Sequence, residues 1–207
     1  MATGQEKSVR RFSTRRLEAL SDGVFAIAMT LLVLNLDAGE VHKVATNHQL
    51  WMALLAMKDQ IISFLVSFLV LGGLWIVHTR QFEHIKESDN HLMWLNNFRL
   101  LAVVIIPFTT SLASDYSGIP LAQLLFSINF FVIILLSNLE WSYAVSKKSG
   151  LKNTLPKEER AKTISQHRVI IATAAAVVVL SAFINQLAFL LFFLTAIAQN
   201  NIFYHKS

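Results

Sequence analysis

Six runs of mainly apolar residues dominate this 207-residue chain. A helix needs about 20 such residues to cross the roughly 30 Å hydrocarbon core of a bilayer, and a soluble domain of this size could not bury so much apolar surface. Charged residues supply only 15% of the chain, whereas soluble domains contain about 25%. The sequence therefore predicts an all-α integral membrane protein.

The predicted spanning helices form a single six-helix domain over residues 1–207. Their approximate bounds are 17–36, 50–84, 92–113, 119–140, 169–184 and 187–198. Only Asn185 and Gln186 separate the last two helices, so we expect them to form a tight helical hairpin.

Loop charge predicts the orientation of these helices, because cytoplasmic loops retain Lys and Arg. Of the 18 basic residues, 15 fall before the first helix, in the second and fourth loops, or in the tail; the odd-numbered loops carry only Lys43. Both termini are therefore expected in the cytoplasm. The formal charge of +5 is explained by topology, and no nucleic-acid partner is predicted.

The sequence contains no recognisable enzyme motif. It has no Cys, no Gly-rich phosphate loop, no Gly-x-Ser-x-Gly elbow and no His-Glu-x-x-His pair. Glu87 and His91 have the i, i+4 spacing of a metal site, but a solvated helix end explains them more simply. We expect no catalytic residue, no resident metal and no cofactor, and hence no enzyme.

Polar side chains inside apolar runs are costly in lipid, which makes them functional candidates. Asp22 lies one to two turns into the first helix, directly after Ser21. Residues at the same depth in the second and third helices are Trp75, His78, Asn96, Asn97 and Arg99. One interpretation is a polar network that joins three helices. The alternative is a proton- or cation-coupled secondary transporter in which Asp22 and His78 titrate.

An apolar stripe follows a different side of the first helix. At 100° per residue, Ile27, Leu31 and Leu34 fall within about 60° of one another, whereas Asp22 lies about 140° from Ile27. Thr30 borders this stripe. Such a stripe is ordinarily a packing seam or a lipid-facing surface. The alternative is the wall of a pore, because apolar constrictions gate channels by dewetting.

The residues after the stripe favour the pore alternative. The helix ends in Asn35, Asp37 and Glu40, and carboxylates there would concentrate cations at a mouth. The Thr-Val-Gly-Tyr-Gly filter of potassium channels is missing. Any ion selectivity must therefore have another origin.

The segment RLEALSD, from Arg16 to Asp22, resembles the first helix of prokaryotic members of the transmembrane protein 175 family. The members of this family are potassium channels. The family pattern is Arg-x-x-x-Phe-Ser-Asp; Arg16, Ser21 and Asp22 match it, and Leu20 replaces Phe. Trp75 with His78, and the third helix from Asn97 onward, also resemble the family.

This resemblance implies a homotetramer in a prokaryotic cell membrane, with the first helix of each subunit around a central pore. Ile27, Leu31 and Leu34 would form the constriction, and Thr30 falls where some relatives have a polar layer linked to selectivity. The implied partners are membrane lipid and permeant monovalent cations.

The resemblance also implies that Arg16, Ser21 and Asp22 hold the first helix against the second and third, with His78 and Asn97 as partners. The expected function is a potassium-permeable channel, weakly selective for K⁺ over Na⁺ and gated by the apolar constriction.

Overall fold

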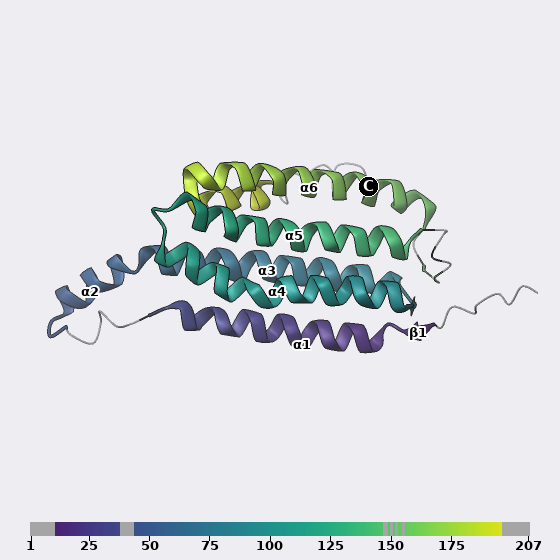
Figure 1. Cartoon of the computed structure of the whole chain (residues 1–207), viewed down its shortest axis with the longest axis horizontal. Coiled ribbons are helices and arrows are strands. Elements are labelled where there is room, and N and C mark those ends of the chain that lie inside the picture. Colours follow the sequence, from purple (N-terminus) through teal and green to yellow (C-terminus); the bar gives the residue numbers. More distant parts are fainter. Residues whose placement is uncertain are drawn as a thin grey trace, which may run out of the picture.

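Long helices packed side by side form the body of the protein (Figure 1). They are α1 (Arg15–Leu31), α3 (Lys58–His84), α4 (Asn90–Asp115), α5 (Pro120–Ala144) and α6 (Lys157–Ile184). The shorter elements are β1 (Phe12–Ser13), η1 (Leu32–Asn35), α2 (Asn47–Ala56), β2 (Glu87–Ser88) and η3 (Asn185–Phe189). This computed structural model describes residues 11–37, 44–146, 149, 151, 153–154 and 156–195.

Five helical stretches are long and apolar enough to cross a membrane, which confirms the predicted class of all-α membrane protein. They are Arg15–Asn35, Lys58–His84, Asn90–Asp115, Pro120–Ala144 and Ser165–Thr195. The last of these stretches includes the beginning of the sixth predicted helix, which is helical over 190–195; residues 196–198 lie outside the described residues. The six-helix count therefore stays a prediction.

The predicted single helix over 50–84 is wrong, because the structure has two helices there. α2 ends at Ala56, Met57 has ψ 7°, and α3 begins at Lys58. The carboxylate of Asp59 lies in the first turn of α3, where it favours a helix N-terminus. It also accepts a 2.7 Å hydrogen bond from Ser117 Oγ. These interactions fix a new helix start in the middle of the apolar run.

The order of packing places α1 at one edge of the subunit. α1 packs on α3 and α4, α5 packs on α4, and α6 packs on α5 (Figure 1). The aromatic rings of Phe126, Phe130 and Phe189 meet between α5 and η3, with centroids 5.0–5.2 Å apart. These rings join η3 to α5, and α1 and α6 form the two edges of the subunit, each with one side exposed.

The turn after α6 is held by polar contacts in the bundle interior. Asn185 has φ 53° and ψ −139°, a positive-φ conformation like that of the first central residue of a type II′ turn, where Gly, Asn and Asp are favoured. Gln186 Nε2 donates to Ser63 Oγ at 2.9 Å and to the Ala113 carbonyl at 3.2 Å. Figure 1 shows the chain turning back at this point, as expected for the predicted hairpin.

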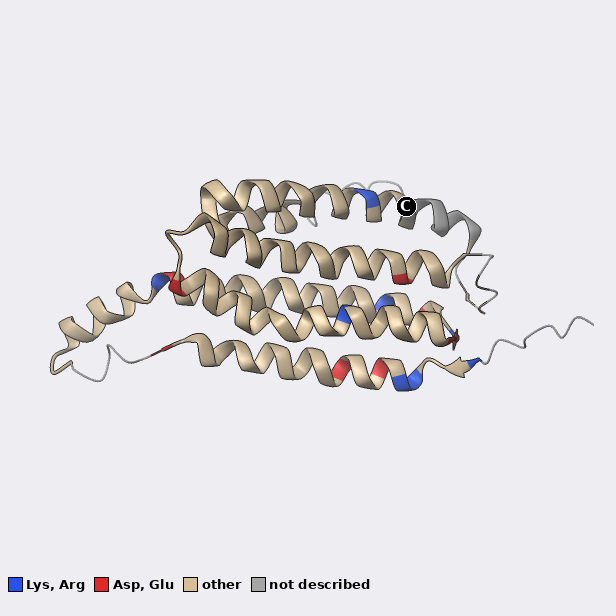
Figure 2. Cartoon of the chain, viewed as in Figure 1, with Lys and Arg blue, Asp and Glu red and all other residues tan. Residues whose placement is uncertain are grey.

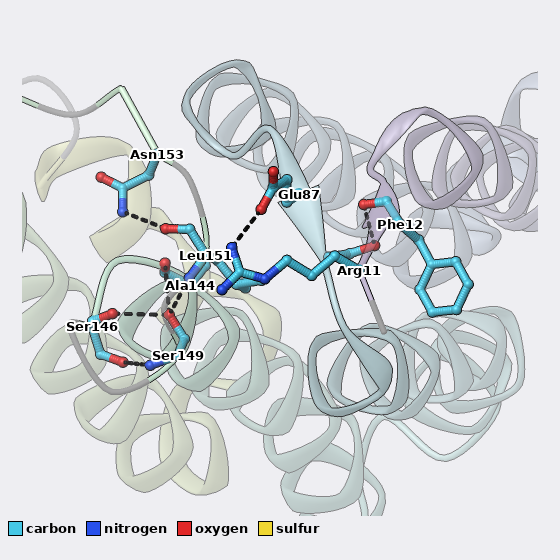
Figure 3. A network of polar contacts seen from close by, with 9 residues as sticks. Arg11, Phe12, Glu87, Ala144, Ser146, Ser149, Leu151 and Asn153 are labelled. Atoms are coloured by element: carbon cyan, nitrogen blue, oxygen red, sulfur yellow. Dashed lines mark hydrogen bonds and ion pairs between the residues drawn. The ribbon is translucent and has the colours of Figure 1, made fainter. Parts of the chain in front are cut away.

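The half of the bundle that contains β1 and β2, which we call the basic end, also contains most of the described Lys and Arg residues (Figure 2). β1 and β2 pair antiparallel, and Arg11 Nη1 lies 2.9 Å from Glu87 Oε2 (Figure 3). Thr14 Oγ1 donates to the Ile85 carbonyl at 3.2 Å. The start of α1 is thereby fixed to the connection between α3 and α4.

Truncation of Phe189 tests the aromatic core. Phe189→Ala removes a fully buried ring, and such cavities cost about 3–5 kcal/mol. We expect a clearly lower unfolding temperature in detergent for Phe189→Ala than for Phe183→Ala, the same change at a 79% exposed position. Equal unfolding temperatures would contradict this packing.

Candidate pore helix and its polar anchor

The first spanning stretch, α1 with η1, divides into a buried seam and an exposed stripe. The seam faces the bundle and comprises Leu17, Ser21, Phe25, Ala28 and Leu32. On another side, Ile27 is 61% exposed, Leu31 41% and Leu34 73%. The three residues predicted to form a constriction therefore share an exposed surface at the edge of the subunit.

Thr30 adds a polar atom to this exposed surface. Its Oγ1 donates a 2.8 Å hydrogen bond to the Ile27 carbonyl one turn earlier. Because the hydroxyl proton is used there, the oxygen lone pairs remain available as acceptors. A hydroxyl oxygen in this state is a suitable ligand for a water molecule or a monovalent cation.

A buried polar network holds the seam of α1 against α4. Ser21 Oγ donates to Asn96 Oδ1 at 3.2 Å, and Arg99 Nη2 donates to the same oxygen at 2.6 Å. The Phe25 ring lies over the Arg99 guanidinium, with 5.9 Å from Cζ to the ring centroid. Two side chains of α1 thus contact the Asn96–Arg99 pair directly.

The same arginine connects α4 to α3 and α5. Arg99 Nε lies 3.2 Å from Glu140 Oε2, and both side chains are 1% exposed. Arg99 Nη2 also lies 3.4 Å from His78 Nε2, and the His78 ring packs on Phe25 and Phe82. Arg99 is therefore the centre of a network that joins its own helix, α4, to α1, α3 and α5.

Asp22 forms a separate contact on the outside of the bundle. Trp75 Nε1 of α3 donates to Asp22 Oδ1 at 2.8 Å, and both residues are exposed in the subunit. Ser21 and Asp22, adjacent in the sequence, therefore attach α1 to two different helices.

The structure corrects two of the expected partners in this network. Asn97 is exposed, and Asn96 is the buried residue that meets Ser21. Asp22 pairs with Trp75, and His78 pairs with Arg99.

Arg16 is exposed in the first turn of α1. The sequence does not predict a role for Glu140, because the expected helix ends there, whereas α5 continues to Ala144.

The other end of the first spanning stretch is also anchored. Asn35 Nδ2 donates to the Pro107 carbonyl of α4 at 2.9 Å. Of the two carboxylates expected near a pore mouth, Asp37 is exposed at the end of this stretch, and Glu40 lies outside the described residues. The stripe is thus presented by a segment fixed to α4 near both of its ends.

These features define a helical membrane protein whose edge helix is anchored by a buried polar network and exposes an apolar stripe. A family model described as endosomal/lysosomal potassium channel TMEM175 matches residues 16–107. A potassium channel of Chamaesiphon minutus is 32% identical over 158 residues, which cover 75% of this chain and 77% of that protein. The chain belongs to the TMEM175 family, and it is a multi-pass protein of the cell membrane.

Other relatives match over shorter regions. A potassium channel of Streptomyces collinus is 41% identical over 101 residues, or 49% of this chain and 48% of that one. The human endosomal/lysosomal proton channel TMEM175 is 26% identical over 131 residues, which cover 63% of this chain but only 26% of the human protein.

The fold agrees with a crystal structure from the same family. The structure of a lysosomal potassium-selective channel TMEM175 homolog from Chamaesiphon minutus superposes with a TM-score of 0.74 at 27% identity. The superposition covers 90% of this chain and 96% of that chain.

Charge removal at Glu140 tests the buried anchor. Glu140→Leu leaves the Arg99 guanidinium uncompensated in the bundle, and breaking a buried pair in this way costs about 3–5 kcal/mol. We expect a strong loss of thermal stability and yield, whereas Glu83→Gln, at an exposed carboxylate of α3, changes little.

A double-mutant cycle separates the ion pair from simple loss of packing. Arg99→Leu combined with Glu140→Leu removes both charges of this ion pair. The combined loss of stability is therefore expected to be smaller than the sum of the two single losses. Purely additive losses in thermal unfolding would show that the two charges do not interact.

Proposed function

We propose that this chain is the subunit of a homotetrameric, potassium-permeable cation channel in which α1 of each copy lines the pore. The observation that carries the proposal is the exposed edge of α1, with Ile27, Leu31, Leu34 and Thr30 on one surface. Two bacterial relatives are named potassium channels, and this supports K⁺ as the permeant ion.

Exposed polar residues on two sides of α1, Asp22 and Thr30, argue that lipid does not surround its exposed surface. Asp22 is exposed one to two turns into a membrane-length stretch, and Trp75 supplies its hydrogen bond. A carboxylate facing hydrocarbon is expensive, so such groups face protein or water in membrane proteins. Neighbouring copies packed around α1 would supply that environment and would enclose the exposed stripe.

The proposed gate is a set of apolar rings. Four copies of Ile27, Leu31 and Leu34 around one axis would form a neck that a hydrated cation cannot pass while it is narrow and dry. A small rotation or tilt of α1 would widen and wet the neck. The anchors at Ser21 and Asn35 would then act as pivots for this motion.

The proposed selectivity is modest. Partial dehydration at the apolar neck costs more for Na⁺ than for K⁺, because Na⁺ holds its water more tightly. Four Thr30 hydroxyl oxygens would replace part of the lost hydration. We further propose that the basic end faces the cytoplasm, in accord with the retention of Lys and Arg there.

The described contacts do not favour the transporter alternative. Asp22 and His78 would have to exchange protons or a cation, yet Asp22 pairs with Trp75 on the outside and His78 lies buried beside Arg99. Each is engaged by a different partner in a different part of the bundle.

Substitution of Ile27 tests the gate. Ile27→Asn places four amide groups in the neck, which favours wetting, so we expect basal K⁺ current to rise several-fold. Ile128→Asn on α5 is the matched control: it adds the same amide to an exposed apolar surface of a helix remote from α1. Unchanged current from a well-assembled Ile27→Asn tetramer would refute the gate assignment.

Substitution of Thr30 tests the polar layer. Thr30→Val keeps the shape of the side chain but removes the oxygen, so we expect the K⁺/Na⁺ permeability ratio to fall while the tetramer remains intact. The ratio is read from reversal potentials under bi-ionic conditions. A ratio equal to that of the unmodified channel would exclude Thr30 from ion coordination.

A further inference from the structure

Helix α2 is an apolar helix with no buried face. It contains no Asp, Glu, Lys or Arg, and none of its residues is buried in the subunit. Five large apolar side chains are exposed: Leu50, Trp51, Met52, Leu54 and Leu55. An apolar surface of this kind is normally buried against lipid or against another protein segment.

Its position argues against burial in the hydrocarbon core. α2 projects beyond the ends of the other helices, past the junction with α3 at Met57 (Figure 1). The charged Lys58 and Asp59 begin α3 at that level (Figure 2), and Asp59 binds Ser117 of the α4–α5 connection. α3 alone spans 27 residues, about 40 Å at 1.5 Å per residue. α2 therefore extends outward from a bundle that already exceeds the hydrocarbon thickness.

Its direction also differs from that of a helix resting on the membrane surface. Interfacial helices lie in the membrane plane, whereas α2 continues outward from α3 and is inclined toward the α1 side of the bundle in this view (Figure 1). The α1 side is the edge that carries the exposed stripe. Copies assembled around α1 would therefore bring their α2 helices together.

The apolar residues of α2 form a stripe suited to helix packing. At 100° per residue, Leu50, Leu54, Trp51 and Leu55 fall within an arc of about 140°. Spacings of one, three and four residues place them on adjacent ridges, as in packed helix pairs. Ala56 lies about 170° from the middle of this arc and is exposed.

We propose that α2 packs through Leu50, Trp51, Leu54 and Leu55 against α2 of a neighbouring copy, so that the four helices form a collar around the outer mouth of the pore. This inference rests on the proposed tetramer. The partner is a second copy of the same chain, because the stripe is uncharged, projects beyond the ends of the other helices and belongs to a helix inclined toward the α1 side of the bundle (Figure 1).

The absence of Cys from the chain makes single-cysteine crosslinking a clean test. Leu54→Cys lies in the stripe, and Ala56→Cys on the opposite side is the matched control. Trp51→Cys serves as a second stripe position. Each full-length variant is oxidised in membranes and separately labelled with a membrane-impermeant maleimide, and its mass in detergent is measured.

We expect Leu54→Cys and Trp51→Cys to give disulfide-linked dimers on non-reducing gels and to react with maleimide roughly tenfold more slowly than Ala56→Cys, because packed interfaces exclude water. Ala56→Cys is expected to give no dimer.

A tetrameric Leu54→Cys protein that labels as fast as Ala56→Cys and forms no dimer would overturn the collar and leave the proposed channel intact. Slow labelling with no dimer after either oxidation or treatment with a longer bifunctional maleimide would show that no second α2 lies beside the stripe, which also overturns the collar. A monomeric mass for the unmodified chain would overturn both the collar and the proposed tetramer.

Discussion

The contacts of the Arg99 guanidinium determine how the helices of this subunit can be arranged. A buried charge in a membrane bundle has no water to solvate it, so it must be paired by neighbouring helices. Glu140 of α5, His78 of α3 and Asn96 of α4 surround it, and Phe25 of α1 covers it. Displacement of α5 would separate the two charges, and displacement of α1 or α3 would remove a contact to Arg99 or to its neighbour Asn96. The network therefore fixes the register of these helices at one depth.

This network explains why α1 presents its stripe at the edge of the bundle. Ser21 and Phe25 are drawn toward Asn96 and Arg99. The helical repeat then places Ile27 and Leu31 on the exposed side. The anchored seam of α1 and its uncovered apolar stripe are thus two consequences of the same contacts. In a pore helix, such a stripe could change its hydration while the seam stays attached to the bundle.

The sequence predicts the membrane class and the stripe, because both depend only on helix length and the 3.6-residue period. It does not predict which of Asn96 and Asn97 points inward, because depth in the membrane is the same for both and only the position of α1 distinguishes them. It also ends the fourth spanning helix at 140, whereas α5 continues to Ala144 and Glu140 lies inside the bundle. Only the buried Arg99 makes this carboxylate compatible with the interior. The break at Met57 depends on Ser117, 58 residues from its partner Asp59, and is likewise invisible to local patterns.

The most direct test of the channel account is the current through a planar bilayer that contains the purified protein, with K⁺ on one side, Na⁺ on the other and equal pH on both. The account predicts discrete openings and a current that does not saturate as the K⁺ concentration rises. It also predicts a reversal potential that shows modestly higher permeability to K⁺ than to Na⁺. A silent bilayer, together with slow, saturable and counter-ion-dependent cation uptake into liposomes, would contradict it and would point to a transporter. In a second recording with a pH gradient across the bilayer, a reversal potential that follows the gradient and does not depend on K⁺ would contradict it as well.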